Sequence, residues 1–335
     1  MAGGTGYAGV ELLRLLLLHP RVELVRASSE QHSGKRLDAV YLSFRGRTDV
    51  VLEELNADRL ADGADVVFSA LPHGTAARTV ARVLEKGVRA LDLSADFRLK
   101  DAEVFRRWYG EHPVPKLLGE AVYGIPEFSR EAIRGARLIA VPGCYPTGAL
   151  LGLVPLARAK RIGEGQVIVD SKSGASGAGR SAKTELLFCE IDESVRAYGV
   201  GSHRHGPEIE QELARAGGPE RVIFTPHILP LRRGILSTIY VPLRDEGDLA
   251  PVFGMYAREP FIQVLDRGTF PDVRDVRGTN AAQIGWTILE GRKTAIVVTA
   301  IDNLGRGAAA QGIQCLNVMC GFDERAGLDA IAAVP

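Results

Sequence analysis

The chain has 335 residues, with 41 Lys or Arg and 41 Asp or Glu, so its formal charge is zero. This length is enough for two domains. The charge balance argues against a nucleic-acid binder that works through a broad basic surface, although it leaves room for a local anion site. No apolar stretch reaches the roughly 18 residues of a membrane span, and the N-terminus lacks the pattern of a signal peptide.

The first feature of the chain is a glycine-rich stretch. Gly3, Gly6 and Gly9 stand three apart, directly before an apolar run at 10–19 that predicts a buried helix. Backbone N–H groups of such a turn, together with the helix N-terminus, attract a pyrophosphate. Taken alone the spacing also fits a glycine-rich surface turn.

A strand normally precedes such a turn, and almost nothing precedes it here. In a doubly wound sheet this first strand is central. We therefore expect that the first strand is missing from the sequence as printed, through a misplaced start or a trimmed sequence; a real truncation is the alternative.

The next segments alternate between strands and helices. Strands are predicted at 22–27, 64–70, 89–94 and 138–141, and helices at 75–85 and 147–159. This alternation indicates an α/β fold with a Rossmann-type, doubly wound parallel sheet.

The character of the chain changes after about residue 166. Longer strand-like segments, with fewer helices between them, occupy 166–170, 221–226, 236–243 and 294–301. They indicate a second domain of α+β type, with the boundary near Gly143. A final helix is predicted at 307–318, in a segment that could return to the first domain.

The segment after the second predicted strand bears on the choice of cofactor. NAD sites usually place an acidic residue there, and NADP sites place basic or hydroxyl groups. Glu30 favours NAD, whereas Ser29, Lys35 and Arg36 favour NADP. The stretch leaves the choice open.

Cys144 is the candidate nucleophile. It lies after a buried strand, in a Pro-Gly-Cys-Tyr-Pro-Thr turn directly before a helix, where the helix N-terminus favours the reactive thiolate. The alternative is a small buried side chain. Cys189, Cys315 and Cys320 are interpreted as structural; without a Cys-x-x-Cys pair or an export signal, reduced thiols in a cytoplasm are expected.

A loop with two histidines could handle the proton of the thiol. His203, Arg204 and His205 precede a predicted helix; histidine can act as acid or base, and arginine can bind a carboxylate or phosphate. A helix-start loop and a metal site are the alternatives, but a two-residue His spacing is a poor zinc pattern and we expect no metal. His73 and His227 flank turns and rank lower.

Two further loops could meet a ligand. The small residues at 173–180 allow close approach of the backbone, and Arg232 and Arg233 before a strand suit an anionic substrate. A flexible connection and a solvated surface turn, respectively, are the alternatives.

Together these stretches resemble one family over the whole chain. The stretches that carry the resemblance are GGTGYAGVELLRLL, DLSADFR at 92–98, VPGCYPT at 141–147, SGASGAGR at 173–180, HRHGPE at 203–208 and DNL at 302–304. They resemble N-acetyl-gamma-glutamyl-phosphate reductases of arginine biosynthesis, relatives of the aspartate-semialdehyde dehydrogenases.

The resemblance implies a covalent mechanism. Cys144 would attack the acyl phosphate of N-acetyl-gamma-glutamyl phosphate, NADPH would reduce the resulting thioester, and N-acetyl-glutamate semialdehyde would leave. His203 would act as acid/base, although His205 remains an alternative for that role. Candidate substrate-binding residues are His205, Arg204, Arg233, Ser94 and Arg98. Candidate cofactor-binding residues are Gly3, Thr5, Gly6, Tyr7, Ala8, Gly9, Ser29, Lys35, Pro72, Ser173, Gly174, Gly177 and Asn303.

The resemblance also implies an organisation. Residues 1–143 would form the dinucleotide-binding domain, 144–305 the catalytic and oligomerisation domain, and 306–335 a C-terminal helix that returns to the first. A homo-oligomer, dimer or tetramer, acting on a small molecule rather than on nucleic acid or a membrane, is expected.

Two positions depart from the family pattern. Glu30 stands where many members carry an arginine that suits the 2′-phosphate of NADP, unless Lys35 or Arg36 replaces it. Arg306 stands where lysine is common, which keeps the charge.

Two rival functions stay open. One is the aminoadipyl-phosphate reductase of lysine biosynthesis, whose members tend to lack the Tyr145-Pro146 pair found here. The other is a catalytically silent nucleotide-binding relative, which would have no chemical need for Cys144 and His203.

Overall fold

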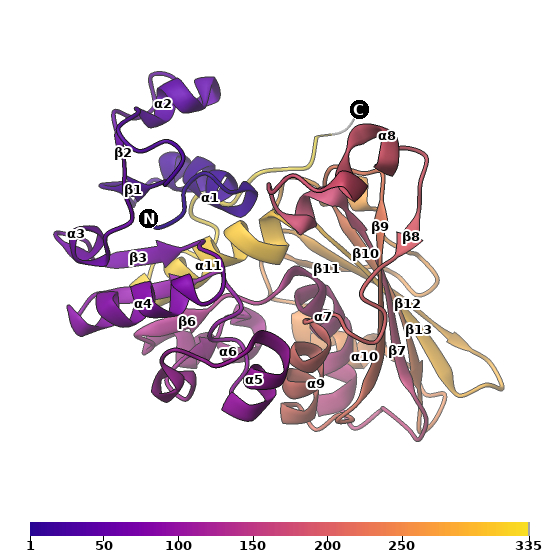
Figure 1. Cartoon of the computed structure of the whole chain (residues 1–335). Helices are drawn as coiled ribbons and strands as arrows, with labels where there is room; N and C mark the ends of the chain where they lie inside the picture. The colour runs from indigo at the N-terminus through magenta and orange to yellow at the C-terminus, as the bar shows by residue number, and fades with distance from the viewer. Residues whose placement is uncertain (334–335) are drawn as a thin grey trace. The chain divides into compact units, whose positions relative to one another are not determined.

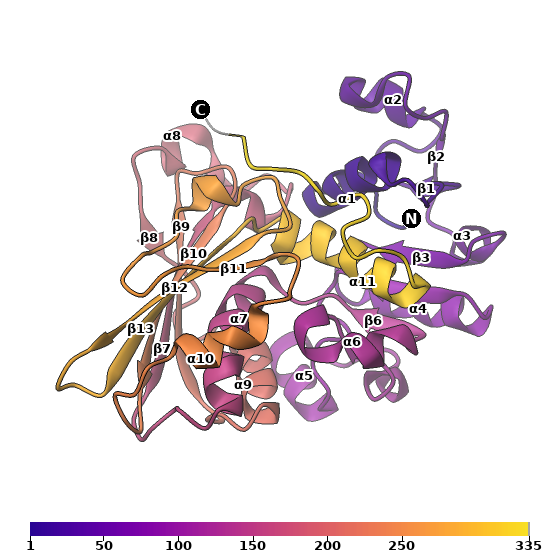
Figure 2. The same ribbon diagram turned by 180° about the vertical axis from the view of Figure 1, so that it is seen from behind.

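A computed structural model describes residues 1–333 as two compact units. The first unit comprises Met1–Pro142 and Ala308–Asp329, and the second comprises Gly143–Gly307 with a short C-terminal piece. Figures 1 and 2 show the elements of each unit from opposite sides.

The first unit contains a parallel sheet. Its strands are β1 (Ala27–Ser28), β2 (Leu52–Glu53), β3 (Val66–Ser69), β4 (Arg89–Asp92), β5 (Val122–Tyr123) and β6 (Leu138–Ala140). They pair in parallel as β1–β2 and as β3–β4–β6–β5. Residues 1–4 lie between the two groups, because Ala2 forms a parallel bridge with Ser69 and the Met1 carbonyl accepts the Ser28 N–H. The predicted parallel α/β sheet is confirmed.

The helices of this unit are α1 (Tyr7–Leu18), α2 (Leu37–Val40), α3 (Ala57–Ala61), α4 (Thr75–Glu85), α5 (Ala102–Tyr109), α6 (Pro126–Arg134) and α11 (Ala310–Cys320). Of these, α3, α4 and α6 contact its strands. The apolar face of α4 packs against β3 and β4, with Val80 and Val83 buried beside Val67 and Ala90. Helix α11 packs against α1 and α6 and so lies in the first unit, although it follows the second along the chain.

The predicted strand at 22–27 is wrong over most of its length, because only Ala27 and Ser28 join a ladder. Residues 1–4 hydrogen-bond with this part of the chain only from Arg26 to Ser28. Between residues 21–26 and β3 lies a cavity of about 390 Å³. A strand needs a hydrogen-bonding neighbour, and residues 22–26 belong to no ladder in the described chain.

The second unit is built on a seven-stranded mixed sheet. Its strands are β7 (Val167–Gly174), β8 (Arg196–Ala197), β9 (Val222–Leu229), β10 (Ile235–Pro242), β11 (Ile262–Val264), β12 (Ala282–Leu289) and β13 (Thr294–Ile301), in the order β11-β12-β13-β10-β7-β9-β8. Its helices are α7 (Cys144–Arg158), α8 (Phe188–Ile191), α9 (Gly206–Arg215) and α10 (Ala250–Phe253). This confirms the predicted α+β domain.

The two faces of this sheet differ. Helices α7, α9 and α10 lie on one side (Figures 1 and 2), where alternate residues of β10 such as Ile235 and Ile239 are fully buried. The other side carries Tyr240 and, on β9, Ile223, both of which stay exposed. Because successive side chains of a strand point to opposite faces of the sheet, one face carries the buried residues of the core and the other face carries exposed residues.

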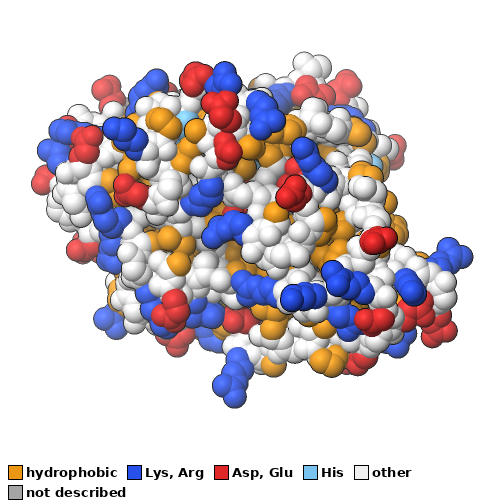
Figure 3. Space-filling view, turned by 90° about the horizontal axis from the view of Figure 1, so that it is seen from below, with side chains coloured by type: hydrophobic (Ala, Val, Ile, Leu, Met, Phe, Trp, Pro, Cys, Tyr) orange, Lys and Arg blue, Asp and Glu red, His pale blue; other side chains and the backbone are white. Residues whose placement is uncertain are grey.

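The surface agrees with the balanced charge. Acidic and basic side chains are intermingled over the face drawn in Figure 3. Among the described residues, no helix is long and apolar enough to cross a membrane.

Candidate active site

Cys144 is the first residue of α7. The helix begins three residues earlier than predicted, with Gly143 as its N-cap in an extended conformation. The half-buried thiol therefore stands at the N-terminus of a helix of 15 residues. The partial positive charge there stabilises a thiolate, which gives the predicted nucleophile a suitable environment.

The residue before the thiol is held by a buried carboxylate. The Gly143 N–H donates to Oε1 of Glu208 at 2.8 Å, and Glu208 is almost fully buried in the first turn of α9. On the other side, the Thr147 hydroxyl donates to the Gly143 carbonyl at 2.9 Å. Sequence reasoning assigned Glu208 no role; its place in the HRHGPE stretch was the available signal.

His203 lies in an aromatic cage. The centroid of its ring is 5.5 Å from that of Tyr145, 5.4 Å from that of Tyr198 and 5.3 Å from that of Phe224, in each case edge to face. Burial, together with the charge of Arg204, lowers the pKa of His203 to about 4. The ring is therefore neutral at physiological pH.

The tautomer of His203 follows from its backbone contact. The N–H of His205 donates to Nδ1 of His203 at 3.1 Å, so Nδ1 is the acceptor and the neutral ring carries its proton on Nε2. The ring of His205 lies 4.9 Å from that of His203, centroid to centroid. The predicted pair is thus one cluster in which the two histidines have different surroundings.

Two tyrosines join this cluster to the thiol. The hydroxyl oxygens of Tyr145 and Tyr198 lie 2.8 Å apart, within hydrogen-bond distance. Burial, together with the charge of the nearby Cys144, raises the pKa of Tyr198 to about 12. The backbone turns at Gly199 with φ +56°, close against the His203 side chain. Sequence reasoning missed Tyr198 and Phe224, because nothing in their local pattern ties them to a site.

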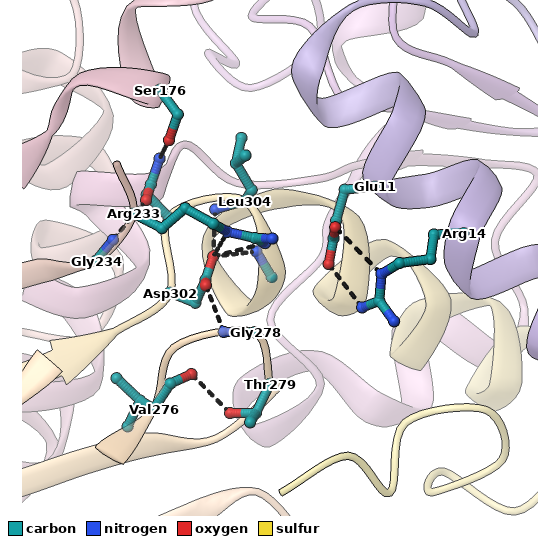
Figure 4. A network of polar contacts seen from close by, with 12 residues as sticks. Glu11, Arg14, Ser176, Arg233, Gly234, Val276, Gly278, Thr279, Asp302 and Leu304 are labelled. Atoms are coloured by element: carbon teal, nitrogen blue, oxygen red, sulfur yellow. Dashed lines mark hydrogen bonds and ion pairs between the residues drawn. The ribbon is translucent and has the colours of Figure 1, made fainter. Parts of the chain in front are cut away.

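Asp302 organises the second group of predicted residues in this unit (Figure 4). Its buried carboxylate accepts hydrogen bonds from Arg233 at 3.0 and 3.2 Å. Next to it, Asn303 accepts from the Gly234 N–H at 2.8 Å and donates to Ser176 at 2.9 Å. The Arg233 charge is therefore balanced by a buried partner, which sequence reasoning did not foresee.

The loop that follows β7 approaches this group closely. A Cβ on Gly174 would lie 2.8 Å from the Leu231 carbonyl oxygen, so only glycine fits there. Gly177 lies near Asn303, and Ser173 is buried at the end of β7. The structure thus brings Ser173, Gly177 and Asn303 together in the second unit.

The glycine stretch of the first unit forms a tight turn. Gly3 has φ +76°, and a Cβ on Gly9 would lie 2.3 Å from the Gly3 carbonyl oxygen. Gly6, the N-cap of α1, has open space where a side chain would be. The N–H groups of Tyr7 and Ala8 belong to the first turn of that helix, an arrangement that suits an anion.

Hydroxyl and basic groups surround this turn. The side-chain oxygens of Thr5 and Ser29 lie 2.8 Å apart. A pocket of about 350 Å³ is lined by His32, Lys35 and Arg36 with two apolar neighbours. Arg36 is engaged by Asp38 at 2.9 Å and Asp49 at 2.7 Å. Lys35, in contrast, forms no ion pair with an acidic side chain in the described part of the chain, so its charge is available to a ligand in this pocket.

Ser94 and Arg98 are buried at the carboxyl ends of the strands. The Ser94 hydroxyl donates to Asp92 at 2.5 Å, and burial raises the pKa of Asp92 to about 6. Arg98 donates to the carbonyls of Val141 and Leu93 at 2.8 and 2.7 Å. Pro72 lies in the turn before α4, exposed. The structure thus gives Ser94 and Arg98 internal partners, and their contact with substrate stays a prediction.

Metal-ligating residues do not gather in the part of the chain that the structure describes: no group of three or more His, Cys, Asp or Glu there could hold an ion. None of the four cysteines, all within that part, takes part in a disulfide.

Two family models match the chain. The semialdehyde dehydrogenase NAD-binding domain matches residues 1–136, and the semialdehyde dehydrogenase dimerisation domain matches residues 144–303. Curated relatives named N-acetyl-gamma-glutamyl-phosphate reductase include those of Geobacter sp. strain M21, 48% identical over 100% of this chain and 99% of the relative, and of Desulfotalea psychrophila, 47% identical over 99% and 98%.

Solved structures agree on the fold. An aspartate semialdehyde dehydrogenase II of Vibrio cholerae superposes with a TM-score of 0.72, at 19% identity, over 96% of this chain and 97% of that one. The aspartate semialdehyde dehydrogenase of Candida albicans, solved with NADP, gives 0.69 at 18% identity, over 97% and 98%.

Proposed function

The chain belongs to the N-acetyl-gamma-glutamyl-phosphate reductases of the semialdehyde dehydrogenase family, and we propose that it reduces N-acetyl-gamma-glutamyl phosphate to N-acetyl-glutamate semialdehyde and phosphate, a step of arginine biosynthesis. The observation that carries this proposal is the cluster in which Cys144 begins a helix and the next residue, Tyr145, packs against a neutral, caged His203.

Cys144 acts as the nucleophile. Its thiolate attacks the acyl carbon, the C–S bond forms, and the C–O bond to phosphate breaks so that phosphate leaves. The covalent step holds the acyl group on the enzyme as a thioester, whose carbonyl accepts a hydride far more readily than a carboxylate does. After reduction, the thiohemiacetal releases the aldehyde as the C–S bond breaks and the thiolate is restored.

His203 stabilises the oxygen of the reacting carbonyl group by donating a hydrogen bond to it. Since its Nδ1 accepts the His205 N–H, its Nε2–H is the group that can donate a hydrogen bond to the oxyanion that forms on the acyl carbon. Its cage of Tyr145, Tyr198 and Phe224 fixes the orientation of the ring.

The anionic groups of the substrate require cations. Arg204 and His205 lie in the same loop as His203, and Arg233 is fixed by Asp302. A guanidinium held in one orientation by a buried carboxylate loses less entropy when it binds an anion. We assign phosphate and carboxylate recognition to these three residues, with Ser94 and Arg98 as further candidates.

The residues of the first unit fit a dinucleotide. The contact between Gly9 and Gly3 leaves no room for side chains, and the N-terminus of α1 presents its N–H groups to a pyrophosphate. Ser29 and Lys35 favour a 2′-phosphate, and hence NADPH over NADH, although Glu30 lies beside them. When bound, the reduced nicotinamide supplies the hydride; Ser173, Gly174, Gly177 and Asn303 would lie against it.

We also propose a homo-oligomer in the cytoplasm. The family description of residues 144–303 as a dimerisation domain supports self-association, and so does the open face of the seven-stranded sheet, where Ile223 and Tyr240 remain 46% and 38% exposed. The absence of disulfides among the four described cysteines suits a reducing compartment.

Single-turnover oxidation of NADPH with N-acetyl-gamma-glutamyl phosphate tests the function. The wild type should oxidise the cofactor in proportion to enzyme, and Cys144→Ala should not, while it still binds NADPH. Equal turnover by both proteins would remove Cys144 from the mechanism. Turnover only with the aminoadipyl acyl phosphate would overturn the substrate assignment.

A further inference from the structure

The turn between β13 and α11 packs directly on the residue that carries the thiol. A Cβ on Gly307 would lie 2.7 Å from Cβ of Cys144 and 3.1 Å from its Cα. Real Cβ atoms do not approach to 2.7 Å, so the two residues lie too close together for a side chain at position 307 unless one of them moves. The backbone at Gly307 therefore packs directly against Cys144.

Asp302 fixes the position of the backbone at Gly307. The Gly307 N–H donates to the Asp302 carbonyl at 2.8 Å, which closes the turn. Inside the turn, Oδ1 of Asp302 accepts the N–H groups of Leu304 and Gly305 at 2.8 and 2.7 Å. The same carboxylate accepts from Arg233, as Figure 4 shows.

A neighbouring loop is fixed by the same side chain. Oδ2 of Asp302 accepts the Gly278 N–H at 2.6 Å. A Cβ on Gly305 would lie 2.3 Å from the carbonyl oxygen of Thr279, so the two loops are in close contact. Asp302 is fully buried, and its carboxylate accepts hydrogen bonds from Arg233, Gly278, Leu304 and Gly305. The turn can shift only if several of these bonds break together.

We propose that Gly307 and Asp302 are positioning residues for the nucleophile: Asp302 fixes the turn, and Gly307 fixes where Cys144 stands at the start of α7. This inference rests on the proposed role of Cys144. A thiol displaced by a fraction of an ångström still ionises and still meets small reagents, but it attacks a bound acyl carbon at the wrong distance and angle.

Gly307→Ala tests the contact, with Gly254→Ala as the matched control. A Cβ at Gly254 meets nothing within 4 Å, and its φ of −55° is open to alanine. For Gly307→Ala we expect kcat to fall about 10- to 100-fold with KM within about twofold of the wild type. The rate at which iodoacetamide alkylates Cys144 should change by less than about threefold. Peptide mass spectrometry follows this reaction, because Cys189 is exposed and reacts as well.

Asp302→Asn provides the second variant, since it keeps the volume of the side chain and removes the charge that gathers these donors. We expect the same fall in kcat, with a higher KM because Arg233 loses its partner. Unchanged kcat in Gly307→Ala would overturn the inference, as would a parallel loss of kcat and alkylation rate. Full turnover by Cys144→Ala would instead refute the proposed function.

Discussion

The backbone N–H of His205 donates a hydrogen bond to Nδ1 of His203. This single contact fixes the tautomer of the ring and shows why two histidines two residues apart need not be equivalent. Neighbouring aromatic rings bury His203, and its lowered pKa keeps it uncharged over the physiological range. The assignment of roles within the HRH stretch follows from that difference.

The rate of turnover should depend on pH through His203. Because the pKa of His203 is about 4 rather than 6.5, kcat should stay flat through pH 6.5 and fall only as the pH approaches 4. The stability that this group contributes is present above pH 6.5 and is lost as the pH falls through 4. A pH–rate profile of the wild type measures this, and an inflection near 6.5 that vanishes in His203→Asn would contradict it.

Substitution separates the two histidines. His203→Asn should lower kcat about 10²- to 10⁴-fold, the usual range for loss of an acid/base group, with the protein still folded. His205→Asn should mainly raise KM. The reverse pattern would transfer the acid/base role to His205.

Asp92→Asn should stabilise the protein at neutral pH. The folded-state pKa of Asp92 is raised from 3.8 to about 6 by burial, so its stabilising contribution is present below pH 3.8 and is lost as the pH rises through 6. At pH 7.5 the amide should therefore raise the free energy of unfolding by up to about 3 kcal/mol. Urea unfolding measures it.

Asp96→Asn is the matched control. Asp96 accepts the N–H groups of Gly74 and Ala77 at the start of α4, so its charge is favourable there and its loss should cost about 1 kcal/mol. If both variants destabilised equally, burial of Asp92 would not be the reason for its shifted pKa.

Cofactor preference should depend on Lys35. Lys35→Ala should weaken NADPH binding about 10-fold or more, the value of a charged hydrogen bond, and leave NADH binding unchanged. Arg36→Ala should change either affinity much less, because Asp38 and Asp49 already balance that charge. Calorimetric titration with both cofactors decides; equal losses for NADPH and NADH would remove Lys35 from the 2′-phosphate site.

Self-association should depend on the open sheet face. Ile223→Asp combined with Tyr240→Asp places two charges on the exposed side of β9 and β10, and should lower the mass measured by sedimentation. Leu42→Asp changes a side chain that is 71% exposed in the first unit and should leave the mass unchanged. An oligomer that survives the double variant would place the interface elsewhere.

Local signals in the sequence predicted much of the fold. The helix at 75–85 begins after a glycine and has a strongly amphipathic pattern, and α4 has those bounds. The strand at 294–301 is a β-branched run and forms β13. By contrast, the segment 22–27 has strand composition but its ladder depends on residues distant in sequence, so the prediction failed.

In the candidate site, too, some residues have a local sequence signal and others are brought in only by contacts between distant segments. Cys144, His203 and the glycine turn carry local patterns, which is why the sequence alone singled them out as candidates, and their roles stay predictions. Tyr198, Phe224 and the Asp302–Arg233 pair enter only through contacts between distant segments, which no local pattern encodes. The choice between the arginine and lysine enzymes came from the relatives, whose names agree with the Tyr145-Pro146 signal.

An acyl-enzyme on Cys144 would change the mass of the peptide that contains this cysteine. After mixing with N-acetyl-gamma-glutamyl phosphate in the absence of cofactor, that peptide should gain an N-acetylglutamyl group, with release of phosphate in equal amount. Addition of NADPH should then remove the adduct, and Cys144→Ala should show neither event. Phosphate release without an adduct, or an adduct on another cysteine, would contradict the mechanism.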